Sequence, residues 1–342
     1  MRYLDMARHG LSLIDIEQAF GTEENCVRYL QAFRWPDGVE CLKCGSKRVS
    51  KFQTNETQRE ITNKKGETRE VKVPARILFQ CNQPGCRHQF SATTGTIFAD
   101  THLPLTTWFK AIGLLMNAKK GISAKQMERD LGVHYRTAWH LNHRIREAMQ
   151  DGDGSLFGGT VEADATFVGG KYDKRRKRGP YGKQAVAGVI QRKSDEGHSK
   201  VRAFPVEKEI ISVMSTVIRE NVATDAEIMT DEHGAYASLK KQGFKHEIVS
   251  HTKEEWVRGN VHTQGIENFW SLFKRGVVGS FHQVSVKHLH RYLNEFSYRF
   301  NNREDEKIFA MTVFNLVMGS ALRYKVLVAK PSPASDAPFA SE

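Results

Sequence analysis

The chain has 342 residues, of which 51 are Lys or Arg and 39 are Asp or Glu, so its formal net charge is +12. This length suffices for two or three domains with cores of their own, and the clustered positive charge favours a polyanionic partner over a neutral one. No apolar run reaches the ~20 residues that cross a bilayer, and the N-terminus lacks the apolar segment of a secretory signal, so we expect a cytoplasmic, nucleoid-associated protein and no membrane.

Changes in composition along the chain predict four segments. We expect a helical lead-in and a cysteine module over 1–100, helices over 101–150, alternating strands and helices over 158–325, and a disordered tail over 326–342. The breaker cluster Asp151-Gly152-Asp153-Gly154-Ser155 marks the main boundary. The tail is rich in Pro, Ser and Ala, and it has too few apolar residues to form a core.

The cysteines of the first segment have the spacing of metal ligands. Cys41 and Cys44 form one pair, Cys81 and Cys86 form another, and a predicted strand hairpin over 59–74 lies between them. Two such pairs around β-structure predict a zinc ribbon, in which four thiolates hold a structural Zn²⁺.

Three alternatives bear on this ribbon. His88 is an alternative to Cys86 as the fourth ligand. The alternative to a zinc site is that the four cysteines are unrelated buried residues. The fifth cysteine, Cys26, is expected to be a core residue. An odd cysteine count also favours thiolate chemistry over a disulfide framework.

The second segment has the pattern of a helix-turn-helix. Apolar residues recur at helical spacing over 105–116, a second helix is predicted over 123–131, Gly132 and Val133 form a turn, and a third helix follows over 135–149. The polar face of that third helix is expected to contact DNA through Arg136, Thr137, His140 and Arg144. A plain helical linker is the alternative.

The third segment alternates strands with helices. Strands are predicted at 160–168, 185–190, 201–204, 226–231 and 247–249, and helices near 210–220, 235–242 and 265–274. This is the element order of a ribonuclease-H-like α/β fold, although the order alone suits other α/β sheets as well.

Three carboxylates in this segment discriminate among those sheets. Asp164 lies on the first predicted strand, Asp231 ends the fourth, and Glu267 lies near the start of the last helix. Two strand carboxylates and one helix carboxylate make an oxygen-only site, which suits a pair of Mg²⁺ (or Mn²⁺) ions and phosphoryl transfer. Glu162 shares a strand face with Asp164, and we expect it to form an ordinary ion pair.

Basic residues accompany the carboxylates. Lys274 lies nearly two helical turns after Glu267 and on the same face, so we expect it to hold the DNA backbone beside the metal ions. Between the first two strands of this segment, a dense basic loop is expected to bind phosphate through Lys174, Arg175, Arg176, Lys177 and Arg178.

Several motifs, taken in order, resemble one known family. They are Cys41-Leu42-Lys43-Cys44-Gly45, Phe90-Ser91-Ala92-Thr93-Thr94-Gly95, Val161-Glu162-Ala163-Asp164-Ala165-Thr166 and Ile266-Glu267-Asn268-Phe269-Trp270. Over about residues 18–320 the chain is similar to bacterial insertion-sequence transposases that carry a zinc ribbon ahead of a D-D-E domain. The resemblance implies metal-dependent cleavage and strand transfer on double-stranded DNA at inverted-repeat ends, by an oligomer that also holds target DNA.

One difference from that family leaves the identity of the third metal ligand open. Parts of that family have Asn as the third ligand, and here Asn268 directly follows Glu267. Two other functions also stay open, namely a DNA-binding regulator with a vestigial catalytic domain and a nuclease of the same fold that cuts without joining.

Overall fold

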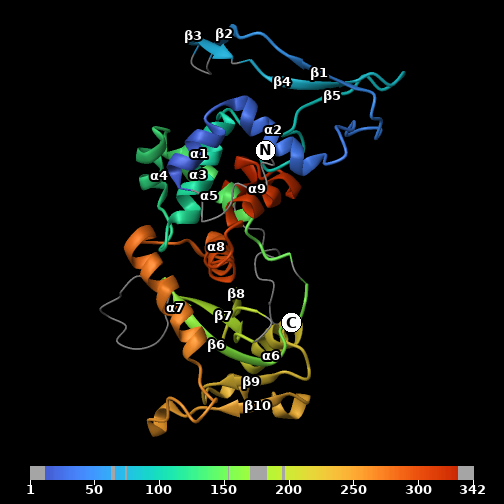
Figure 1. Cartoon of the computed structure of the whole chain (residues 1–342). Helices are drawn as coiled ribbons and strands as arrows, with labels where there is room; N and C mark the ends of the chain where they lie inside the picture. Colours follow the sequence, from blue (N-terminus) through green and yellow to red (C-terminus); the bar gives the residue numbers. More distant parts are fainter. Residues whose placement is uncertain are drawn as a thin grey trace. The chain divides into compact units, whose positions relative to one another are not determined.

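The computed structural model describes residues 12–62, 66–73, 75–152, 154–169, 183–194 and 197–329 (Figure 1). Contacts group them into two compact units. The first contains the described residues up to Gly113 together with Phe309–Leu322, and the second contains Leu114–Ile308 and the described residues from Arg323. The second and third predicted helices, over 123–131 and 135–149, fall within the second unit.

The first unit combines helices with two small sheets. Its elements are α1 (Leu13–Phe20), α2 (Glu23–Arg34), β1 (Val49–Gln53), β2 (Thr57–Thr62), β3 (Thr68–Val73), β4 (Ile77–Cys81), β5 (Gln89–Phe90), most of α3 (Leu105–Asn117), and α9 (Ile308–Met318). Strands β1, β4 and β5 form one antiparallel sheet in the order β1-β4-β5, and β2 pairs with β3 in the predicted hairpin.

Aromatic side chains form the helical core of the first unit. The ring of Phe20 lies 4.8 Å from that of Tyr29, 4.7 Å from that of Phe109 and 5.8 Å from that of Phe309, measured between centroids. Phe309 belongs to α9, so a helix from far along the chain completes this core. The guanidinium of Arg34 donates to the carbonyls of Ala92 and Thr94 and thereby fastens the end of α2 to the segment after the ribbon.

The second unit is built on a mixed five-stranded sheet. Its strands are β6 (Thr160–Val168), β7 (Gln184–Gln191), β8 (Lys200–Val206), β9 (Glu227–Thr230) and β10 (Lys245–Ile248). They lie in the order β10-β9-β6-β7-β8. The pairs β6–β7 and β7–β8 are antiparallel, whereas β6–β9 and β9–β10 are parallel.

The helices of this unit are α4 (Ala124–Leu131), α5 (Tyr135–Glu147), α6 (Ile211–Asn221), α7 (Gln264–Gly276), α8 (Leu289–Asn301) and α10 (Tyr324–Val328). Of these, α6 packs on one face of the sheet, and α7 and α8 pack on the other. Alternate residues of β7 point to opposite faces. Ala185, Ala187 and Val189 pack in the core that α6 closes, and Val186 and Ile190 pack in the core that α7 and α8 close.

Two sequence predictions need correction. The helix predicted over 235–242 is a pair of 3₁₀ turns, η2 (Gly234–Tyr236) and η3 (Lys240–Gln242). The disordered tail predicted from residue 326 begins too early, because α10 extends to Val328 and buries Leu327 to 1 % exposure. From residue 330 on, the tail lies outside the described residues.

A buried ion pair joins α5 to α8 within the second unit. Nε of Arg146 lies 2.6 Å from Oε2 of Glu295, and the two side chains are 2 % and 0 % exposed. Arg299 approaches the other oxygen of Glu295 at 3.1 Å. Removing one partner of such a pair leaves an uncompensated buried charge, so the pair fixes the position of α5 on α8.

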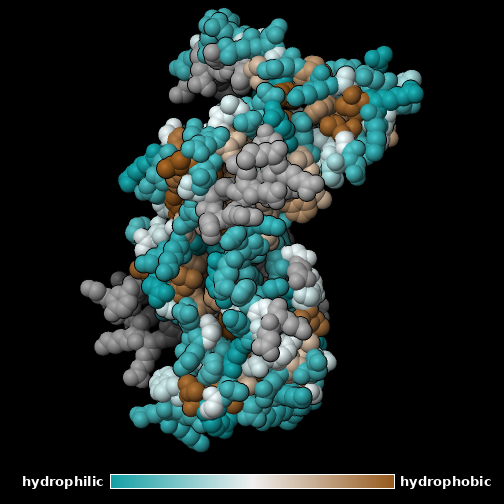
Figure 2. Space-filling model, in the orientation of Figure 1, coloured by the Kyte–Doolittle hydropathy of each residue, from teal (hydrophilic) through white to brown (hydrophobic). Residues whose placement is uncertain are grey.

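None of the helices in the described part of the chain is long and apolar enough to cross a membrane. The face seen in Figure 2 is mostly hydrophilic, and its hydrophobic residues form small separate patches.

Candidate active site and zinc centre

The four cysteines of the ribbon converge. Their sulfur atoms all lie within 4.8 Å of one another, with Cys41 Sγ 3.7 Å from Cys86 Sγ and Cys44 Sγ 3.6 Å from Cys81 Sγ. A tetrahedral Zn²⁺ with bonds of about 2.3 Å to sulfur requires sulfur separations of about 3.8 Å. The spacing of the cysteines therefore fits one zinc ion, as the sequence predicted.

Backbone amides support two of these sulfurs. The amides of Lys43 and Gln83 donate to Cys41 Sγ and Cys81 Sγ, each across 3.4 Å. Such donors stabilise thiolates, which is the state that binds zinc.

The two other predicted assignments in this segment also hold. Cys26 is fully buried, its thiol donates to the carbonyl of Phe20 at 3.3 Å, and burial raises its pKa to about 12. It therefore remains a core thiol. His88 stacks on Phe90 and stands outside the quartet of sulfur ligands.

Asp164 lies in the middle of β6, opposite Gly188 of β7. Nε1 of Trp270, on α7, donates to Asp164 Oδ2 at 3.0 Å. A Cβ atom at position 188 would lie 2.6 Å from the Trp270 ring, so only glycine lets this indole cross β7 to reach the carboxylate.

Asp231 comes directly after β9, the parallel neighbour of β6. The last paired residues are Glu162 and Met229, and Asp164 and Asp231 each follow two positions later. The two aspartates are thus level on adjacent strands and leave the sheet on the same side. The backbone N–H of His233 donates to Asp231 Oδ1 at 3.1 Å, which holds the carboxylate in the turn after the strand.

Glu162 fixes the start of the helix that carries Glu267. Its carboxylate is 1 % exposed and accepts from the N–H of Ile266 at 2.9 Å and from Arg192 Nε at 2.6 Å. A Cβ atom at position 265 would lie 2.9 Å from Glu162 Oε2, so Gly265 leaves the space for this contact. The predicted ion pair is confirmed, and the carboxylate also caps a helix N-terminus.

Glu267 lies in the first turn of α7 with its side chain 46 % exposed. Thr263 Oγ1 donates to its Oε1 at 2.6 Å, and His251 Nε2 lies 3.7 Å from the same atom. These contacts orient the carboxylate.

The carboxylates interact with one another. Burial raises the pKa of Asp164 to about 7, and the charges of Asp231, Glu209 and Glu267 contribute to the increase. The side chains from β6, the end of β9 and α7 are therefore close enough to interact. Among the described residues, they do not cluster as tightly as the four cysteines.

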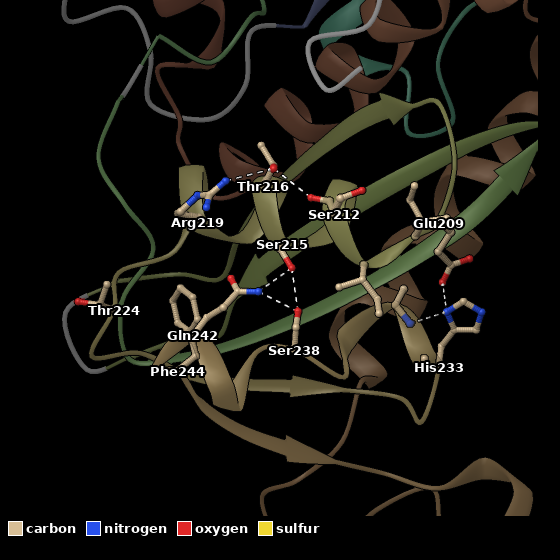
Figure 3. Close-up of a pocket in the computed structure, with 14 residues that line it drawn as sticks. Glu209, Ser212, Ser215, Thr216, Arg219, Thr224, His233, Ser238, Gln242 and Phe244 are labelled. Atoms are coloured by element: carbon tan, nitrogen blue, oxygen red, sulfur yellow. Dashed lines mark hydrogen bonds and ion pairs between the residues drawn. The ribbon is translucent and has the colours of Figure 1, made fainter. Parts of the chain in front are cut away.

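Sequence inspection missed Glu209, which lies between β8 and α6. Its side chain is 13 % exposed, and its Oε1 lies 3.1 Å from His233 Nδ1 (Figure 3). Nothing in Glu207-Lys208-Glu209 distinguishes it from a solvated turn, so only the structure identifies it. An open pocket of about 1270 Å³ begins at this pair and continues along α6 to Arg219 and Phe244.

Tyr236 of η2 is the second residue that the sequence did not reveal. It is 1 % exposed, and its hydroxyl has no hydrogen-bond partner among the described residues. Burial raises its pKa well above the usual value, and the charges of Asp164, Glu209 and Asp231 raise it further. The phenol therefore belongs to the same group of side chains.

Lys274 is exposed on the last turn of α7, seven residues after Glu267. Seven residues turn an α-helix through about 700°, so the two side chains project within about 20° of each other. Asn268, the alternative third ligand, is also exposed.

The second and third helices predicted for this segment form as α4 and α5, and one residue of the predicted polar face of α5 needs correction. Gly132 ends α4, and Glu128 Oε1 accepts from the N–H of Tyr135 at the start of α5. Arg136 is exposed, and Thr137 and His140 are partly exposed. Arg144 is only 5 % exposed, so it does not present its guanidinium to DNA as predicted. The predicted phosphate-binding residues Lys174, Arg175, Arg176, Lys177 and Arg178 lie outside the described residues.

Comparisons with known proteins agree on one family. A model of the ISXO2-like transposase domain matches residues 156–301, and a model of the transposase zinc-ribbon domain matches residues 21–89. A Halobacterium salinarum relative, described as an uncharacterized protein in transposable element ISH50, is 25% identical over 82% of this chain and 92% of its own length. An uncharacterized transposase-like protein of Haemophilus influenzae is 33% identical over 26% of this chain and 70% of its own length.

Proposed function

The chain belongs to the ISXO2-like transposases that carry a zinc ribbon, and we propose that it catalyses metal-dependent DNA cleavage and strand transfer at the inverted-repeat ends of an insertion sequence. One observation carries the proposal. Asp164 and Asp231 each lie two positions beyond the last pair of the parallel strands β6 and β9, and α7, which carries Glu267, reaches Asp164 through the indole of Trp270.

The sheet topology supports a ribonuclease-H-like fold for the second unit. Three antiparallel strands continue into two parallel ones, with the first strand of the unit in the centre. In this arrangement the central strand and its parallel neighbour carry the two aspartates at one level.

Asp164, Asp231 and Glu267 would hold Mg²⁺ or Mn²⁺. Oxygen-only donors suit these hard cations, and neighbouring like charges need a counter-charge. When bound, such ions supply an activated hydroxyl nucleophile and stabilise the departing oxygen in an in-line displacement. We assign the third position to Glu267 rather than Asn268 because an anionic carboxylate is the ligand that Mg²⁺ prefers, and Thr263 orients this carboxylate.

The protein's own residues position these groups. Trp270 orients Asp164, the His233 amide orients Asp231, and Thr263 orients Glu267. Lys274 projects from the same side of α7 as Glu267, where its ammonium attracts a backbone phosphate and holds the strand beside the carboxylates.

The remaining parts would bind DNA. The zinc ribbon and the start of α5, with Arg136, Thr137 and His140, would read the element ends, because residues at the N-terminus of a recognition helix reach base edges. The loop with Lys174, Arg175, Arg176, Lys177 and Arg178 would contact phosphates. We propose that a homo-oligomer acts on paired ends and target DNA in the cytoplasm, at the nucleoid.

A strand-transfer assay tests the proposal. Purified protein, pre-cut ends of its own element and Mg²⁺ are expected to give a joined product that Asp231→Ala abolishes while end binding persists. Tight end binding without joining in Mg²⁺ or Mn²⁺ would instead indicate a DNA-binding regulator. Cleavage of uncut ends without joining would indicate a nuclease.

A further inference from the structure

We infer that Glu209 is a fourth carboxylate of the cation site, sharing a divalent ion with Asp164 and Asp231. This inference rests on the proposed function and deepens it. It adds a ligand from an element that contributes none of the three acidic residues identified from the sequence.

The placement of Glu209 is the first argument. It immediately precedes the N-cap of α6, and its side chain is largely buried at 13 % exposure. Its Oε1 faces His233 Nδ1 at 3.1 Å, and the His233 amide holds Asp231 at 3.1 Å. Glu209 therefore reaches the turn that presents the second aspartate (Figure 3).

The contacts of Glu209 leave an oxygen available. The N–H of Ala235 donates to His233 Nδ1 at 3.4 Å, and Oε1 of Glu209 lies 3.1 Å from the same nitrogen. The contact of Glu209 with His233 uses Oε1 alone. The described residues give Oε2 no hydrogen bond, so this oxygen is available as a ligand.

The charge balance is the second argument. Asp164, Asp231 and Glu209 carry like charges within interacting distance, and the charge of Asp231 acts on both of the others. Among the described residues, His233 is the one basic side chain paired with Glu209. Partly buried like charges are costly without a cation, which a divalent ion would supply.

The orphaned hydroxyl of Tyr236 is the third and independent argument. A buried polar atom without a partner is rare, and it points to a ligand or an ordered water. The charges of Asp164, Glu209 and Asp231 all act on this phenol. A hydrated cation held by these three carboxylates would give the hydroxyl a partner.

Calorimetric titration of Mn²⁺ tests the inference with the full-length, zinc-loaded protein bound to a pre-cut end duplex. Glu209→Gln is expected to weaken the binding of one Mn²⁺ at least tenfold. It should also raise the melting temperature without added Mn²⁺, because it removes like-charge repulsion. Glu220→Gln, at an exposed acid near the C-terminal end of α6, is the matched control and should change neither quantity.

A His233→Ala variant separates direct binding from positioning. If Glu209 holds the cation itself, His233→Ala should retain Mn²⁺ affinity within about threefold of wild type. Glu209→Asp keeps the charge, but its shorter side chain moves the carboxylate away from the cation. This variant should fold and still lose Mn²⁺ affinity. Equal losses in His233→Ala and Glu209→Gln would overturn the inference, because Glu209 would then act only through the turn.

The failure of this inference is distinguishable from failure of the proposed function. If Asp164→Asn abolishes Mn²⁺ binding while Glu209→Gln binds within twofold of wild type, the inference is overturned and the proposed function stands. If the wild-type complex binds no Mn²⁺, both are overturned.

Discussion

Nε1 of Trp270 donates a hydrogen bond to Oδ2 of Asp164 across 3.0 Å, which links the helix that bears Glu267 to the strand that bears the first aspartate. The contact exists because Gly188, opposite Asp164, has no Cβ atom in its path. One proposed catalytic carboxylate is thereby oriented by the element that carries another.

Trp270→Phe is expected to keep most of the ring packing and to remove this hydrogen bond. Strand transfer should fall at least tenfold, while the free energy of unfolding should fall by only about 1 kcal/mol, the net value of one hydrogen bond. Joining assays and urea titrations measure the two effects. Trp256→Phe, at a site 58 % exposed, is the control. Unchanged joining by Trp270→Phe would contradict the assigned role of the indole.

Gly265→Ala should displace the Glu162 carboxylate from the start of α7, because the new Cβ would lie 2.9 Å from Oε2. We expect a loss of about 1–3 kcal/mol in the free energy of unfolding, the cost of unpairing a buried charged group. Joining should fall as well, since Glu267 lies two residues further along in the same first turn of α7. Gly158→Ala meets no atom within 4 Å and serves as the control. Equal stability of the two variants would rule out this capping contact.

The purified chain should contain one zinc ion, measured by mass spectrometry of the metal. Cys44→Ser should lose it, and because zinc sites of this kind contribute about 10–16 kcal/mol to folding, the ribbon should become protease-sensitive. Cys26→Ser should retain the metal, since that thiol bonds to Phe20 and lies outside the quartet. Zinc loss in Cys26→Ser would reject the ligand set.

Arg136→Ala should weaken binding to the element ends by at least about 1 kcal/mol and should reduce the salt dependence of binding by about one ion. Arg144→Ala should instead lower the free energy of unfolding, because that side chain is 5 % exposed, and leave the affinity of the folded protein unchanged. Fluorescence anisotropy at several salt concentrations measures both affinities. The opposite pattern would mean that α5 approaches DNA by its other end.

His143 predicts a pH dependence of stability. Burial, and then the charges of Arg146, His288, Arg291 and His290, lower its pKa far below the usual value. The unfolded chain therefore binds a proton that the folded chain excludes, so stability is present above pH ~6.5 and is lost below it at about 1.4 kcal/mol per pH unit. Relative to His143→Phe, wild type should lose about 1.4 kcal/mol between pH 7.5 and 5.5 in urea titrations. Parallel pH profiles for the two proteins would contradict this.

The sequence predicted those parts of the fold in which a local pattern has one solution. The apolar run over 160–168 forms β6, and the paired cysteine spacings form the ribbon. Over 235–242 the apolar residues suggested an α-helix. Tyr236 and Leu239, both buried, are three residues apart, which is the period of the 3₁₀ turns that form instead.

Long-range packing decided the rest. Helical periodicity places Arg144 on a polar face of α5, but it does not say that α8 and its neighbours cover that face. Glu209 resembles Arg144 in this respect. An acid in a charged turn can be recognised as part of a site only when the fold brings His233 and Tyr236 close to it. The return of α9 to the first unit likewise depends on aromatic contacts that span most of the chain.

The ion pair between Arg146 and Glu295 holds two helices of the proposed enzyme at a fixed spacing. It fastens α5, the helix that we propose reads bases, to α8, which packs against β8 of the same sheet that carries Asp164. The protein then sets the distance between the bases that it reads and the phosphate that it cuts. Each base pair of DNA spans about 3.4 Å of that distance. An element end with one base pair inserted between them would present its scissile phosphate out of phase with the carboxylates.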